Sequence, residues 1–199
     1  MTPANKGRKL PPEVLTRSEL DSLIKSCDRR SFTGLRAKAL IVFMWRTGLR
    51  CSEALSVRPC DLSRKQNTVR VLHGKGAKAR TVGIDDSTLA LIDDWIGRRK
   101  AVGVREGPLF CSRTGSPVHG SSVRRLFDML RQRAGLSKRF HPHSLRHTFA
   151  CELVREGTPV NIVQQLLGHN NLATTNTYLQ GIEPLEAINA IKNRPDPNA

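Results

Sequence analysis

The sequence has no apolar segment long enough to cross a membrane and no recognisable leader. Its longest apolar run is the short stretch ALIVFMW, residues 39–45, against the ~18 residues that a spanning helix needs. The opening residues MTPANKGRKLPPEV contain no apolar core of the kind found in secretory signals. These absences predict a cytoplasmic protein that no segment anchors in a membrane.

Cysteines are few, and their spacing does not suggest a metal-binding or redox motif. They number five, and no two form a C-x-x-C arrangement. A chain of 199 residues buries about 70% of its unfolded surface on folding, so disulfides are not needed for stability. We therefore expect one domain with reduced thiols.

Acidic residues are also scarce. The chain has 17 Asp and Glu against 33 Lys and Arg, for a formal net charge of +16. Such a balance indicates a polyanionic partner, either nucleic acid or an anionic membrane surface. The basic residues are spread along the whole chain, which favours a folded basic surface over a flexible basic tail.

Internal repeats and low-complexity tracts are absent, and helical patterns dominate. The stretch NTVRVLHGKGAKARTVGI has two β-branched runs around a glycine-rich tip, which predicts a hairpin or small sheet. Helices are predicted over residues 17–27, 34–47, 51–57, 86–101, 121–134, 143–157, 160–168, 174–180 and 184–193. The expected class is mainly α with a small antiparallel β-sheet (α+β).

The stretch HPHSLRHTFA, residues 141–150, concentrates three of the six histidines around one arginine. On a helix His143, Arg146 and His147 share one face, while Leu145 and Phe149 point the other way, toward a core. A metal site is disfavoured because the arginine repels a cation. Solvated or capping histidines are one remaining interpretation, and a grip on phosphate oxygens is the other.

Four further segments have similar character, although each is weak alone. TGLRCSE places Arg50 after a glycine-ended helix with Glu53 one turn later, and HGKGAKAR places Lys75 at a hairpin tip without the G-K-[ST] ending of a nucleotide loop. LLGH contains His169, just past a short helix. TNTYLQ contains Tyr178, the only tyrosine, which by itself would be read as a core aromatic residue.

Taken together, these segments resemble the catalytic domain of the tyrosine recombinases, the phage integrase and Xer-like family. The resemblance runs from about Thr16 to Ile191, and the order Arg, Lys, His-x-x-Arg, His, Tyr is that of the family. The spacings agree as well: 3 residues from His143 to Arg146, 23 from there to His169, and 9 more to Tyr178. The resemblance implies a catalytic set of Arg50, Lys75, His143, Arg146, His169 and Tyr178.

The resemblance also implies a role for each residue. Tyr178 would attack a DNA phosphodiester, form a 3′-phosphotyrosine and release a 5′-hydroxyl. Arg50 and Arg146 would hold the non-bridging oxygens, and Lys75 would protonate the leaving oxygen. His143 would accept or orient the tyrosine proton.

The remaining site residues have supporting roles. His169 would add a hydrogen bond to the phosphate, and Glu53 would support the site by bonding His143 or Arg50. In the hairpin, Lys78 and Arg80 are expected to contact the DNA backbone. Neither a metal nor a cofactor is required.

The expected partner is double-stranded DNA, with self-association into the tetrameric synapse of the family. We expect a flexible basic segment at residues 1–15, a catalytic domain at 16–182, and a C-terminal helix and tail at 183–199. This last segment either reaches a neighbouring subunit or folds back on its own domain. Family members carry an N-terminal clamping domain, so the chain is either a minimal form or a fragment.

Two other functions stay open. A non-catalytic DNA-binding regulator would fit the basic charge, because GTPVNIVQQLLGHNNLATTNTY superficially reads as a helix-turn-helix. A DNA relaxer of the type IB topoisomerase kind would share the chemistry without site-specific exchange. The complete set of six residues argues against the first, whereas the sequence does not separate the second cleanly.

Overall fold

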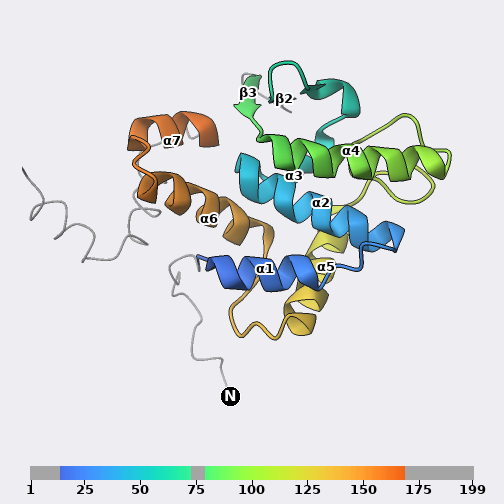
Figure 1. Ribbon diagram of the computed structural model, residues 1–199, viewed down its shortest axis with the longest axis horizontal. Coiled ribbons are helices and arrows are strands. Elements are labelled where there is room, and N and C mark those ends of the chain that lie inside the picture. The colour runs from blue at the N-terminus through green and yellow to red at the C-terminus, as the bar shows by residue number, and fades with distance from the viewer. Residues whose placement is uncertain (1–13, 73–78, 169–199) are drawn as a thin grey trace, which may run out of the picture.

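The structure, a computed structural model, describes residues 14–72 and 79–168, in which helices dominate and the sheet is small (Figure 1). The helices and strands are α1 Arg17–Lys25, α2 Phe32–Thr47, α3 Cys51–Ser56, the 3₁₀ turn η1 Pro59–Asp61, β1 Leu62–Ser63, β2 Thr68–Val71, β3 Arg80–Gly83, α4 Asp86–Ala101, α5 Gly120–Arg133, α6 Pro142–Arg155 and α7 Val160–Leu167. The predicted class, mainly α with a small antiparallel sheet, is confirmed. The helices predicted over 174–180 and 184–193 lie outside the described residues.

Local side-chain chemistry fixes where the helices begin and end. Thr16 and Glu19 form the predicted capping box of α1, with the Thr16 amide donating to Glu19 Oε2 at 2.7 Å. Helix α2 ends at Gly48, whose φ of +64° lies in the left-handed region that glycine adopts readily. Asp85 caps α4 by accepting a hydrogen bond from the Thr88 amide.

The sheet is antiparallel with strand order β1-β2-β3. Strands β2 and β3 form the predicted hairpin, and their register pairs Val69 with Val82 and Val71 with Arg80. The three valines are buried, so one face of the hairpin packs on the helices. Strand β1 was not predicted, because two residues are too short to show an alternating pattern.

Helix α2 lies at the centre of the fold. It contacts α4 along one side and α6 along another, with α1 and α3 at its borders (Figure 1). Its side chains Phe43 and Met44 are fully buried, as the apolar run ALIVFMW predicts. Trp95 of α4 completes this core and donates from Nε1 to the Leu109 carbonyl at 2.8 Å.

The same arrangement brings several chain segments together at one end of α2. The C-terminal end of α2 leads through Gly48 into α3, and α6 crosses beside it and contacts α7.

Within residues 14–72 and 79–168, no helix combines the length and apolarity that crossing a membrane requires.

Candidate active site

Arg146 lies at the centre of the site and is almost completely buried, with 3% of its surface exposed. It comes from the second turn of α6. Its Nη1 donates to the Gly48 carbonyl at 2.7 Å, and its Nη2 donates to the Leu167 carbonyl at 2.6 Å. These two bonds join the C-terminal ends of α2 and α7 to α6 and fix the plane of the guanidinium.

Glu53 organises a second group of charges, and its carboxylate lies between two arginines. Oε1 accepts from Arg50 Nη1 at 2.9 Å, and Oε2 accepts from the Arg50 backbone amide at 2.8 Å. Arg80 approaches from β3 and donates to both oxygens, at 3.0 Å and 2.8 Å. Burial raises the pKa of this carboxyl, but the hydrogen bonds from Arg80 and Arg50 outweigh it and lower the pKa to about 2. Glu53 is therefore ionised at neutral pH.

Gly168, at the end of α7, also contacts this group of charges. Its carbonyl accepts from Arg50 Nη2 at 3.4 Å, a long hydrogen bond. A β-carbon added to Gly168 would lie only 3.2 Å from the Arg80 guanidinium, and φ is +63°. Glycine at this position therefore lets the chain turn tightly against Arg80 as α7 ends.

His143 lies at the exposed start of α6. Partial burial lowers its pKa, and the nearby positive charges of Arg146, Arg50 and Arg124 lower it further. The imidazole is therefore neutral at neutral pH and can accept a proton. The preceding His141 is the N-cap of α6, and its Nδ1 accepts from the Ser144 amide at 3.3 Å.

The structure brings together Arg50, Glu53, His143 and Arg146, four of the residues singled out from the sequence. Of the two partners expected for Glu53, it bonds Arg50. Lys75, Lys78, His169 and Tyr178 lie outside the described residues.

The pairing of Arg80 with Glu53 was not predicted from the sequence. The side chain of Arg80 is 16% exposed and pairs with Glu53. The expected contact of Arg80 with the DNA backbone stays a prediction. The roles of the Gly48 and Leu167 carbonyls were not predicted either, because every residue has a backbone carbonyl and residue type does not mark those that accept a bond. Among residues 14–72 and 79–168, no cluster of His, Cys, Asp or Glu forms a possible metal site.

The cluster can stabilise an anion. Arg50 and Arg80 share a single carboxylate, and Arg146 adds a third guanidinium, so the local charge is positive. Arg146 and Arg50 are held in place by hydrogen bonds to the protein. Preorganised donors of this kind stabilise charge that develops on phosphate oxygens without having to reorganise.

Gly48 supports this site, and Gly48→Ala is expected to destabilise the protein. An alanine would suffer the left-handed backbone strain of about 1–2 kcal/mol, and its β-carbon would lie 2.3 Å from the Phe149 ring. The forced repacking should add about 1–3 kcal/mol. Gly103→Ala is the matched control, because φ there is +85° with open space around the position. Equal losses of unfolding free energy in urea would show that the Phe149 contact is unimportant.

Comparison with known proteins agrees with the family resemblance found in the sequence. The sequence model described as the phage integrase family matches residues 13–182. A tyrosine recombinase of Thermosipho africanus is 35% identical over 186 residues, which cover 93% of this chain and 62% of that protein. Tyrosine recombinase XerC of Bacillus licheniformis is 35% identical over 178 residues, 87% of this chain and 58% of that one. The chain thus spans about three fifths of the length of these curated relatives.

Solved structures show the same similarity in three dimensions. A crystal structure of XerA recombinase superposes with a TM-score of 0.82 at 26% identity, covering 95% of this chain and 68% of that one. XerH site-specific recombinase, in a post-cleavage complex with a palindromic difH substrate, gives 0.76 at 28% identity, covering 93% and 54%.

Proposed function

The chain belongs to the phage integrase family, and from that premise we propose that it is a tyrosine recombinase that breaks and rejoins double-stranded DNA. The observation that carries the proposal is Arg146, pinned between the carbonyls of Gly48 and Leu167 beside Arg50. A DNA-binding module would gain little from burying an arginine in this way, whereas a phosphoryl-transfer site needs fixed donors.

The proposed reaction replaces one phosphoester bond by another. The Tyr178 hydroxyl oxygen attacks phosphorus, the bond from phosphorus to the 5′-oxygen breaks, and a 3′-phosphotyrosine results. The tyrosine proton passes to His143, and the departing 5′-oxygen takes a proton from Lys75. Because one phosphoester replaces another, the reverse attack by a 5′-hydroxyl rejoins the DNA without ATP.

The described residues support this mechanism in two ways. Hydrogen bonds to the protein fix Arg50 and Arg146, which supports their proposed role in stabilising charge on the non-bridging oxygens. The lowered pKa of His143 keeps its imidazole neutral and able to accept the tyrosine proton. We propose the roles of Tyr178, Lys75 and His169 from the resemblance, and the backbone contact of Lys78 from its charge in the hairpin.

Recombination exchanges strands between two duplexes, so we also propose that the protein acts as the tetrameric synapse of its family. Residues 183–199 would then contact a neighbouring subunit. The XerH relative was solved on difH DNA, which supports DNA as the partner.

The test is a covalent trapping assay. The full chain is mixed with nicked duplexes drawn from its genomic neighbourhood, so that cleavage releases a short fragment and the adduct accumulates. We expect a protein–DNA adduct on denaturing gels without divalent metal, and none with Tyr178→Phe.

The alternatives predict other outcomes. A duplex that is bound but gives no adduct would favour the non-catalytic regulator. An adduct that forms on any sequence, together with relaxation of supercoiled plasmid, would favour the topoisomerase-like relaxer.

A further inference from the structure

A positively charged hollow, separate from the candidate active site, lies at the opposite end of α2. It has a volume of about 530 Å³ and is lined by residues of the α2 start, the α4 end and the turn at residues 112–116. Because α2 has 16 residues, this hollow is about 24 Å from the Gly48 end of the helix. It is therefore separate from the phosphate site at Arg50 and Arg146.

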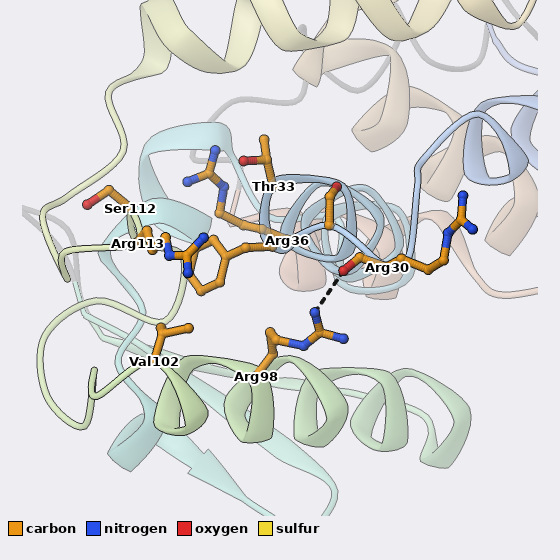
Figure 2. A pocket seen from close by; sticks show the side chains of 9 residues that line it. Arg30, Thr33, Arg36, Arg98, Val102, Ser112 and Arg113 are labelled. Carbon is orange, nitrogen blue, oxygen red and sulfur yellow. Dashed lines mark hydrogen bonds between the residues drawn. The ribbon is translucent and has the colours of Figure 1, made fainter.

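Three guanidinium groups give the hollow its charge. Figure 2 shows Arg36, Arg98 and Arg113 around it, whereas the side chain of Arg30 points away. None of the residues that line it is acidic, and none of the ion pairs formed within residues 14–72 and 79–168 involves these three arginines. Since arginine stays charged at all relevant pH, the hollow carries an uncompensated charge of about +3.

Two of the arginines are held in place by backbone carbonyls. Arg36 donates from Nη1 to the Cys111 carbonyl at 2.8 Å, and Arg98 donates from Nη1 to the Arg30 carbonyl at 2.9 Å. Each guanidinium has five N–H donors, so one such bond orients the group and leaves other donors for a ligand. Orienting cations without neutralising them is typical of a site for a phosphate or carboxylate.

The turn that carries Arg113 is well ordered by its own hydrogen bonds. The Ser112 amide donates to the Ser116 carbonyl at 2.8 Å, and Ser112 Oγ accepts from the Ser116 amide at 3.0 Å. This turn leads into α5, and Arg124 of α5 is close enough to His143 to lower the histidine pKa.

We propose that this hollow binds a backbone phosphate of the same duplex, away from the phosphate that is cleaved. The inference rests on the proposed function, since it takes DNA as the ligand. A duplex has a phosphate every 3.4 Å of axis on each strand, so a separation of about 24 Å corresponds to roughly seven base pairs. The contact adds affinity and orients the duplex, and it has no part in the chemistry.

The salt dependence of DNA binding tests this proposal. Arg113→Gln is introduced into the full chain carrying Tyr178→Phe, and binding of a labelled duplex is followed by fluorescence anisotropy from about 50 to 200 mM salt. Losing one phosphate contact should reduce the slope of log K against log salt by about 0.9. Affinity at the low-salt end should fall about two- to fivefold, as for an exposed ion pair.

Arg105→Gln is the matched control, because it removes the same charge from an exposed residue that does not line the hollow. Arg98→Gln is a second variant at the opposite wall, with its folding checked by thermal melting. An unchanged slope in both pocket variants, or an equal change in the control, would overturn the proposal.

A small phosphate ligand is the competing source of the same chemistry. Titration of inorganic phosphate by calorimetry distinguishes it: saturable binding that Arg113→Gln abolishes, with an unchanged DNA slope, would assign the hollow to a small anion and overturn the DNA proposal. Failure of the proposed function looks different, because the trapping assay would then give no adduct whatever the salt slopes show.

Discussion

Arg146→Lys is expected to lower the rate of DNA cleavage by about 10²–10³-fold while DNA still binds. The lysine keeps the positive charge, so the long-range attraction to DNA is retained. It loses the planar fork that bonds the Gly48 and Leu167 carbonyls at the same time. A single ammonium cannot replace both bonds and also face the scissile phosphate in a fixed direction.

The same substitution should destabilise the fold. The two carbonyls are buried with Arg146, and leaving one of them without its donor costs about 1–3 kcal/mol. The C-terminal end of α7 would also lose a hydrogen bond to α6, although the apolar contacts between the two helices would remain. Reduced catalysis should thus be accompanied by a lower midpoint in urea unfolding.

Single-turnover cleavage of a nicked duplex and urea unfolding measure the two effects. Arg155→Lys is the control, since Arg155 is exposed in the last turn of the same helix and its replacement should change stability by less than about 0.5 kcal/mol. Cleavage by Arg146→Lys at the unmodified rate would show that the fork has no role in stabilising the transition state.

Sequence patterns predict the skeleton of this fold well, for identifiable reasons. Helix α4 begins at Asp86 and ends at Ala101, as predicted, and Asp85 caps its start. Helix α2 ends at Gly48 because the left-handed turn there needs a glycine. Such signals are local, and each is contained within one turn of the chain.

The hydrogen bonds and ion pairs of the site were harder to predict, because they join residues that are distant in sequence. Glu53 and Arg80 are 27 positions apart, and they meet because the side chain of Arg80 reaches from β3 to Glu53 of α3. Arg146 was placed on a face shared with two histidines, yet it is buried because α2 and α7 both pack against α6. Residue type identified the cationic side chains, whereas the packing determined which carboxylate or carbonyl each of them bonds.

Glu53→Gln is expected to cost about 3 kcal/mol of unfolding free energy at neutral pH. The carboxyl pKa falls from its ordinary 4.5 to about 2 in the folded protein, and each pKa unit corresponds to about 1.4 kcal/mol. The cost of breaking a buried ion pair, about 3–5 kcal/mol, is of the same size. A neutral amide would leave Arg50 and Arg80 facing each other without an anion between them.

The pH dependence has a definite direction. Because the folded-state pKa is depressed, the stabilisation by Glu53 is fully present above about pH 4.5 and is lost as the pH falls toward 2. The difference in unfolding free energy between the unmodified protein and Glu53→Gln should therefore be constant near neutrality and more than halved by about pH 3. Glu106→Gln, at an exposed position, should show almost no difference at either pH.

The effect on cleavage separates a structural role of Glu53 from a positioning role. If the carboxylate orients Arg50 for the phosphate, then Glu53→Gln lowers the cleavage rate even where the variant is fully folded, and Glu53→Asp restores part of it. Single-turnover cleavage at low temperature, where both variants are folded, measures this directly. A variant that loses stability but cleaves at the unmodified rate would limit Glu53 to holding β3 against α3, and Arg50 would then be oriented by the Gly168 carbonyl alone.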